Sequence, residues 1–155
     1  MQYETTASEP QILVRNASEE LVAADQGGAA AQDRLSVLTF ERASSKFVRR
    51  IINARMMRRQ FFDDTFFSDP AWDILLELYA LQCEDHRISV SKLSVAADLP
   101  CTTALRWIDK LESECLVVRT ADPLDGRRVW VALSDQGMRR MRSYVELVWR
   151  AGLPI

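Results

Sequence analysis

The fold of this chain is decided by residues 89–134, which read SVSKLSVAADLPCTTALRWIDKLESECLVVRTADPLDGRRVWVALS. Apolar residues at three- and four-residue spacing predict a short helix, a tight turn at Leu99-Pro100 and a second helix. Residues 116–118 and 129–133 then predict two short strands joined by an arginine-bearing loop. This order is that of a helix-turn-helix followed by a β-wing, an architecture that can place its second helix in the major groove of DNA.

Residues 101–115 have two chemically distinct sides when they are placed on a helical wheel of about 100° per residue. The apolar side contains Cys101, Ala104, Leu105, Ile108, Leu111 and Cys115. The opposite side contains Thr102, Thr103, Arg106, Lys110 and Ser113, with Trp107 at the boundary. Hydroxyl and cationic side chains can hydrogen-bond phosphates and base edges, so helix 101–113 is predicted to bind DNA. The alternative is an ordinary solvated face, since charges opposite an apolar stripe are common.

The segment 121–128, with sequence ADPLDGRR, predicts a hairpin loop because Asp-Pro and Asp-Gly are turn-forming pairs. We expect Arg127 and Arg128 at its exposed tip, where their simplest use is to bind an anionic partner. Arginine suits the narrow minor groove of DNA, and Asp125 is expected to pair with the guanidinium of Arg127 and orient it. The alternative is a solvated turn with a surface ion pair.

The segments that flank this region differ in composition. Residues 1–35 contain one aromatic residue and scattered acids, too little to bury a core, and are predicted to be a flexible tail. Residues 36–155 are predicted to form one winged helix-turn-helix domain, mainly α with a small β-wing. Apolar spacing within it predicts a long N-terminal helix over 39–62 and a C-terminal helix over 135–151, the candidate dimerisation helices. Helix N-caps are predicted at Asp69, Ser89 and Ser134.

Composition narrows the class of protein. The 155 residues are 48% hydrophobic and 27% charged, with a net charge of −2, which is typical of a folded globular protein. One histidine and three cysteines give no metal or disulfide pattern, so we expect no metal and no cofactor. A phosphate-binding glycine loop and a nucleophile motif are both missing, so an enzyme is not expected. The sequence has no secretory signal pattern and no apolar stretch of about 20 residues, which predicts a cytoplasmic protein without membrane contact.

The segments LRWIDKLESECLVVR and DPLDGRRVWVALSDQG resemble the MarR family of winged-helix transcription regulators, over residues 88–137. The matching positions are Leu111, Leu116, Val117, Arg119, Asp125, Arg127, Leu133, Ser134 and Gly137. The resemblance implies a major-groove contact through Thr102, Thr103, Arg106 and Lys110. It also implies that Arg127, positioned by Asp125, enters the minor groove.

The same resemblance implies a homodimer formed through the N- and C-terminal helices, and it admits a small-molecule effector of unknown identity. Two features depart from the family. Cys115 stands where the family usually has a glycine after the recognition helix, so that turn must close without the conformational freedom of glycine. The last helix is short, because Gly152 and Pro154 end it.

The sequence therefore predicts a sequence-specific transcription regulator that binds double-stranded DNA. The alternative is a winged-helix module that binds a protein and not DNA. The basic segment 40–62, the acidic segment 63–88 and the aromatic cluster 61–67 could form a protein-binding surface. Balanced charge over residues 89–134 favours this alternative, whereas the arginines of the wing favour DNA.

Overall fold

The computed structural model describes the backbone of residues 11–63 and 66–152, with side chains for Gln32 and from Arg34 onward. The chain divides into two compact units, the first ending at Thr39 and the second beginning at Phe40. The expected flexible tail, residues 1–35, falls partly outside the described residues, and its mobility stays a prediction.

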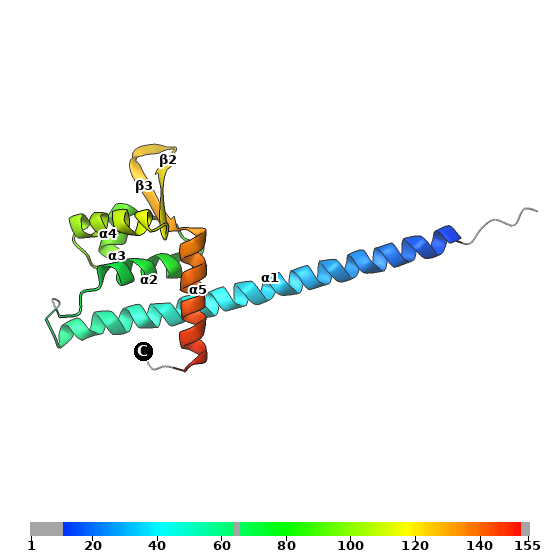
Figure 1. Cartoon of the computed structure of the whole chain (residues 1–155), viewed down its shortest axis with the longest axis horizontal. Helices are drawn as coiled ribbons and strands as arrows, with labels where there is room; N and C mark the ends of the chain where they lie inside the picture. Colours follow the sequence, from blue (N-terminus) through cyan, green and yellow to red (C-terminus); the bar gives the residue numbers. More distant parts are fainter. Residues whose placement is uncertain (1–10, 64–65, 153–155) are drawn as a thin grey trace, which may run out of the picture. The chain divides into compact units, whose positions relative to one another are not determined.

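The described residues form helices and three short strands, drawn along the chain in Figure 1. The elements are α1 (Gln11–Met57), the 3₁₀ turn η1 (Arg58–Gln60), α2 (Pro70–Cys83), β1 (Ile88–Ser89), α3 (Val90–Ala96), α4 (Cys101–Ser113), β2 (Val117–Asp122), β3 (Asp125–Leu133) and α5 (Asp135–Arg150). The strands make one antiparallel sheet in the order β1-β3-β2. This is a winged helix, so the predicted fold class, mainly α with a small β-wing, is confirmed.

Three of the helices begin at the predicted N-caps. The side chains of Asp69, Ser89 and Ser134 each accept a hydrogen bond from the backbone N–H three residues later, at 3.3, 3.5 and 3.0 Å. Each bond satisfies a donor that the first helical turn leaves without a partner. The starts of α2, α3 and α5 were therefore fixed by local sequence alone.

The first helix differs from its prediction at both ends. The pattern predicted residues 39–62, whereas α1 runs from Gln11 to Met57. Residues 11–38 hold many alanine, leucine, glutamate and glutamine residues and no proline, so their backbone favours a helix even without a core to bury. At the other end, η1 replaces the last predicted turn, just before the Phe61-Phe62-Asp63 sequence.

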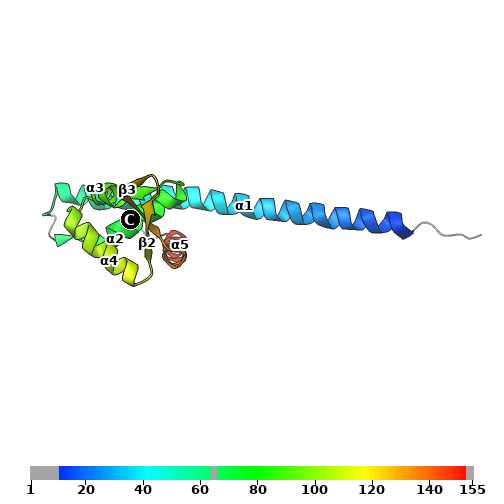
Figure 2. The ribbon, with the colours of Figure 1, turned by 90° about the horizontal axis from the view of Figure 1, so that it is seen from above.

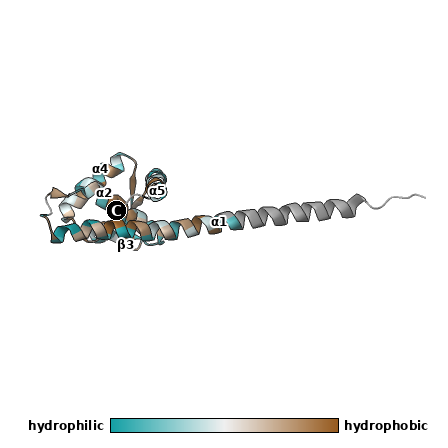
Figure 3. Ribbon diagram, turned by 90° about the horizontal axis from the view of Figure 1, so that it is seen from below, coloured by the Kyte–Doolittle hydropathy of each residue, from teal (hydrophilic) through white to brown (hydrophobic). Residues whose placement is uncertain are grey.

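The core of the second unit is built around α2. Figure 1 shows α2 between the part of α1 from Phe40 onward and the α3–α4 pair. Figure 3 shows apolar and polar residues alternating along this part of α1. The fully or nearly fully buried side chains are Val48, Ile74, Leu76, Leu78, Tyr79, Leu93, Ile108, Val117, Val131, Leu133, Met141 and Val145. Because every helix from α1 to α5 contributes to this list, the wing and the helix-turn-helix share one core.

A charged cluster joins α1 to α2 at the edge of that core. The guanidinium of Arg49 lies 2.7 Å from Glu77 Oε2 and 3.0 Å from Glu84 Oε2, and Ser45 Oγ donates to Glu84 Oε1 at 2.6 Å. The hydrogen bond from Arg49 lowers the pKa of Glu84 to about 2. Burial has the opposite effect on Glu77 and raises its pKa. The ionised form of Glu84 is therefore the one that holds the two helices together.

Glu84→Gln is expected to destabilise the protein most above about pH 5 and progressively less toward pH 2. Because the folded-state pKa is depressed, the stability that Glu84 contributes is present above its unfolded pKa of 4.5 and is lost as the pH falls toward about 2. Urea unfolding of both proteins across this range measures the difference, and Glu77, present in both, largely cancels. The exposed Glu114→Gln is the control and should change stability by less than about 0.5 kcal/mol at each pH. A Glu84→Gln deficit that stays constant down to pH 2 would contradict this account.

A compact junction connects α4, the wing and α5. The backbone N–H of Leu116 donates to the carbonyl of Leu111 at 2.9 Å, which closes α4, and Ser134 N–H donates to the carbonyl of Leu116 at 2.9 Å. Ser134 Oγ donates to the carbonyl of Cys115 at 2.5 Å. A Cβ atom on Gly137 would lie 2.1 Å from the Leu116 carbonyl oxygen, so only glycine fits there. The first turn of α5 thus packs directly against the chain that leaves α4.

Cys115 takes a left-handed backbone conformation at this junction, with φ of 57°. This is the position where glycine normally ends a helix, because a Cβ atom is unfavourable at positive φ. The structure therefore confirms that the turn closes without glycine. It does so with some strain, of about 1 kcal/mol for a residue other than glycine.

Cys115→Gly is expected to stabilise the protein by about 0.5–1 kcal/mol, because it removes this strain although it adds freedom to the unfolded chain. The midpoint of urea unfolding is the measurement. The same substitution at Cys101, which is helical in the first turn of α4, is the matched control and should be destabilising. Equal effects at the two positions would show that the conformation of Cys115 carries no strain.

Candidate nucleic-acid interface

The polar side of α4 faces solvent and its apolar side faces the core. Thr102, Arg106 and Lys110 are exposed and Thr103 is half-buried, whereas Ala104, Ile108 and Leu111 are buried. These positions agree with the helical wheel. Their contact with DNA stays a prediction.

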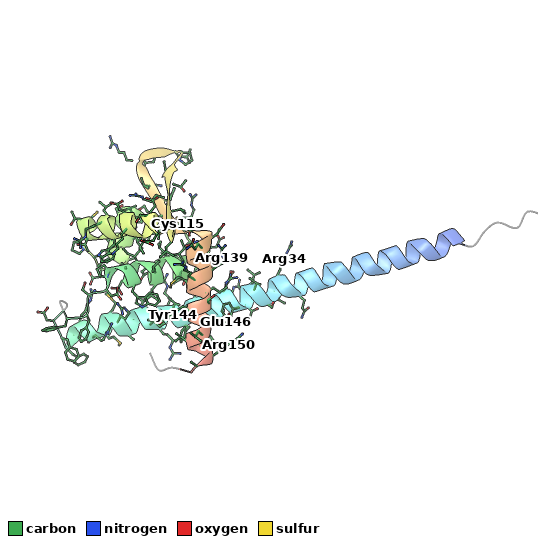
Figure 4. The ribbon with its side chains drawn as sticks, viewed as in Figure 1. Arg34, Cys115, Arg139, Tyr144, Glu146 and Arg150 are labelled. Atoms are coloured by element: carbon green, nitrogen blue, oxygen red, sulfur yellow. The ribbon has the colours of Figure 1, made fainter. Side chains whose placement is uncertain are left out.

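Three residues assigned to the apolar side are exposed. Leu105 is 39% exposed and Cys101 is exposed, because both lie in the first turns of α4, where the helix borders a hollow facing the wing. Cys115 is exposed because it lies beyond the end of the helix, in the left-handed turn near the start of α5 (Figure 4). The apolar side of α4 is therefore narrower than the wheel predicted.

Arg119, on β2, pairs with both acids of α4. Its guanidinium lies 2.8 Å from Asp109 Oδ1 and its Nε donates to Glu112 Oε2 at 2.9 Å. These bonds lower the pKa of Glu112. Within the described chain no ion pair is formed by Arg106, and the ammonium of Lys110 lies over the ring of Trp107, 4.9 Å from its centroid. The cations of α4 are thus left available to an outside anion while its carboxylates are not.

The wing turns earlier than predicted. The turn consists of Pro123 and Leu124, and the Leu124 N–H donates to Asp122 Oδ1 at 2.9 Å. Proline presets the backbone for this turn, and Asp122 caps it, so Asp125-Gly126 is not needed for a second one and continues as strand β3. Arg127 and Arg128 therefore lie on the strand and not at the hairpin tip.

The two wing arginines have different surroundings. The guanidinium of Arg128 lies 3.4 Å from Asp122 Oδ2 and 3.4 Å from Asp125 Oδ2, and 5.4 Å from the ring centroid of Trp130. Arg127 is exposed and makes no ion pair with any described residue. The predicted pairing of Asp125 with the Arg127 guanidinium is thus wrong. Asp125 instead accepts a hydrogen bond from the backbone N–H of Arg127 at 3.1 Å and offers its other oxygen to Arg128.

A hollow of about 450 Å³ separates the wing from α3 and α4. Its charged lining residues are Lys92, Arg119, Asp125, Arg127 and Arg128. Of its four cations, Arg119 and Arg128 are paired with carboxylates, whereas Lys92 and Arg127 form no ion pair with any described residue and can attract an anion. The sequence interpretation missed Lys92, although its position three residues after the Ser89 cap placed it in the first turn of α3. Figures 1 and 2 show that the wing rises beside α4, with β2 between α4 and α5.

Other kinds of site lack support in the part of the chain that the structure describes. No helix there is both long enough and apolar enough to cross a bilayer. No group of three or more histidine, cysteine, aspartate or glutamate side chains is gathered as metal ligands in those residues. Cys83, Cys101 and Cys115 are free thiols.

No family model matches this chain, and no curated protein matches it. Several solved structures match it in fold. A point mutant of MepR from a multidrug-resistant S. aureus clinical isolate matches with a TM-score of 0.50 and 19% identity over 69% of this chain and 77% of MepR. The S. aureus MepR–DNA complex matches with a TM-score of 0.50 and 19% identity over 68% of this chain and 86% of that chain.

The chain has the winged-helix fold of MarR-family regulators. The resemblance of residues 88–137 to that family is thereby confirmed at the level of fold, and identities this low carry no further conclusion. Residues of α4 and of the wing line one hollow in this chain, so the two elements share a surface.

Arg128→Ala is expected to lower the free energy of unfolding by about 1 kcal/mol, because it leaves the buried carboxylate of Asp122 without its cation and removes the stack on Trp130. Arg127→Ala is the matched control at the neighbouring position and should change stability by less than about 0.5 kcal/mol. Urea unfolding of both variants provides the comparison. If Arg127→Ala were the more destabilising change, the two roles assigned here would be reversed.

Proposed function

We propose that this protein is a sequence-specific, DNA-binding transcription regulator without catalytic activity. The observation that carries the proposal is that Arg127, exposed and without an ion pair among the described residues, lines a hollow between the wing and α4. Arg106, on the exposed side of α4, likewise forms no ion pair with any described residue. The fold supports it, since MepR, which shares that fold, has been solved in complex with DNA. The proposal includes a cytoplasmic location, because a transcription regulator must share a compartment with the DNA that it binds.

In the proposed complex, α4 lies in the major groove and the wing, residues 121–128, lies on the minor groove. The candidate base and phosphate contacts of α4 are Thr102, Thr103, Arg106 and Lys110. Arg127 enters the minor groove, where the potential attracts an unpaired guanidinium. Arg128 is a weaker DNA ligand than Arg127 in this proposal, because Asp122 and Asp125 already neutralise it.

The proposal includes a homodimer, because two recognition helices can then read half-sites about one helical turn apart. In the second unit the large apolar side chains Met57, Tyr144, Leu147 and Trp149 are between 43% and 68% exposed, on α1 and α5. Apolar side chains of this size concentrated on two helices fit burial in a partner copy. The shortness of α5 limits its share of such an interface.

The first test is recovery of fragmented genomic DNA by the purified protein at two salt concentrations. Wild type is expected to enrich a palindromic site that survives moderate salt, and the Arg106→Ala/Arg127→Ala double variant is expected to lose it. In affinity measurements on the recovered site, Arg106→Ala should cost about 1–3 kcal/mol, concentrated at one or two base pairs. Arg127→Ala should weaken binding to all sequences, and most to those with a narrow minor groove.

Arg150→Ala is the matched control, since Arg150 lies at the end of α5 farthest from the wing (Figure 4). It should bind like wild type. Undiminished binding by both single variants would place any DNA-binding surface elsewhere on the molecule.

One observation favours the alternative, a protein-binding module. Phe61, Phe62, Phe66 and Phe67 are 77%, 57%, 75% and 45% exposed, an unusual amount of aromatic surface for one segment. Weak recovery of DNA that ignores sequence, vanishes with salt and is unaffected by the double variant would favour this alternative.

A further inference from the structure

Trp130 lies at the centre of the three-stranded sheet and contacts two guanidinium groups. It pairs with Ser89 on β1 and with Thr120 on β2. The guanidinium carbon of Arg87 lies over its ring at 4.8 Å from the centroid, and that of Arg128 at 5.4 Å. Such contacts hold a cation by the negative face of the aromatic ring.

The two arginines differ in what their N–H donors do. Those of Arg128 face Asp122 and Asp125. Arg87, in contrast, forms no ion pair with any residue that the structure describes; the nearby Glu84 is paired with Arg49 and lies 3.7 Å from His86 Nδ1. Stacking uses the flat face of a guanidinium and leaves its in-plane N–H groups free. Arg87 is therefore held in place with its donors still available.

Arg87 is on the opposite face of the sheet from the hollow that borders α4. Thr120, Trp130 and Ala132 line a second hollow of about 340 Å³, together with Arg87 at the end of the α2–β1 link. Arg127, Arg119 and Val129 line the first hollow, as does Arg128. The three-stranded sheet thus has one unpaired guanidinium beside each face, Arg127 of the hairpin at one and Arg87 of the α2–β1 link at the other.

This arrangement matches the geometry of a minor groove, whose two walls are the two phosphate backbones. A hairpin inserted between them turns one face toward each strand. A fixed guanidinium with free donors can bind a phosphate through two parallel hydrogen bonds.

We propose that Arg87 binds a DNA phosphate on the strand facing the outer side of the wing, and that Trp130 positions it. The inference rests on the proposed function and adds to it a second backbone contact, outside the recognition helix and the hairpin. Arg87 supplies charge and hydrogen bonds to the phosphate. Trp130 supplies orientation only.

The test is the salt dependence of binding to a fluorescein-labelled duplex of mixed sequence, measured by anisotropy with the full chain. Each phosphate contact contributes about 0.9 to the slope of log Kobs against log salt. Arg87→Ala is expected to reduce the magnitude of that negative slope by about 0.9 per bound chain, and Arg127→Ala is expected to do the same. Arg150→Ala, remote from the wing, should leave the slope unchanged. A mixed-sequence duplex suffices, because phosphate contacts do not depend on base identity.

Substitutions of Trp130 separate positioning from charge. Trp130→Phe keeps an aromatic face under Arg87 and should bind like wild type. Trp130→Ala should weaken binding several-fold with the slope nearly unchanged, because the guanidinium is still present but no longer held. Far-UV circular dichroism confirms that each variant is folded before its binding is compared.

An unchanged slope and affinity in Arg87→Ala, with a lowered slope in Arg127→Ala, would overturn this inference and leave the proposed function intact. Failure of the wild-type protein to bind both this duplex and any genomic site would overturn both. A slope lowered in both Arg87→Ala and Arg127→Ala, but not in Arg150→Ala, is the supporting result.

Discussion

The orientation of α4 relative to the wing depends on the hydrogen bonds that converge on Ser134. Its backbone N–H donates to the carbonyl of Leu116. Its hydroxyl donates to the carbonyl of Cys115 and accepts a hydrogen bond from the N–H of Gly137. One residue thus joins the end of α4, the strand that follows it and the start of α5. The backbone of Gly137 packs so closely against Leu116 that a Cβ atom has no room, which fixes the position of α5 relative to the chain that leaves α4.

A second connection ties this assembly to the core helix. The side-chain amide of Gln82, at the end of α2, accepts from the backbone N–H of Leu133 at 2.6 Å and donates to its carbonyl at 3.4 Å. The amide side chain here acts as an extra hydrogen-bond partner for the C-terminal end of β3, beyond the two residues that β1 pairs. The cation-bearing surfaces of α4 and the wing are therefore held at fixed separation by backbone contacts, and their side chains are free to meet a ligand.

Electrostatic pairing decides which charges remain on that surface. The chain carries a net charge of −2, which would argue against binding a polyanion. Arg119 pairs with two carboxylates of α4, and Arg128 pairs with the two aspartates of the wing. The charged side chains of α4 and the wing that form no ion pair with a described residue are the cations Arg106, Lys110 and Arg127. The sign of an interface therefore follows from local pairing and not from the sum over the chain.

The sequence predicted the parts of this structure that depend on local chemistry. The caps at Asp69, Ser89 and Ser134, the order of the helices and of the two strands of the wing, and the burial of Ile108 follow from short-range rules, and each is confirmed. The short strand β1 was not predicted. The sequence interpretation placed Arg127 and Arg128 wrongly because two turn-forming pairs compete within five residues and only the first makes the turn. Other features depend on contacts between distant residues. Leu105 is exposed because it borders the hollow beside the wing, and a helical wheel holds no information about neighbouring elements. The contact of Arg87 with Trp130 joins residues far apart in the chain, and no motif marks it.

The four tryptophans of this chain are distributed in a way that has an optical consequence. Trp72 packs edge-on against Tyr144, and Trp149 packs at a tilt against Phe47, away from the wing. Trp107 and Trp130 instead lie beneath cations, on α4 and in the sheet. Any anion that draws those cations away changes the electric field at two indole rings and leaves the other two untouched. Binding of an anion to the cationic surface should therefore change the intrinsic tryptophan fluorescence of the unlabelled protein.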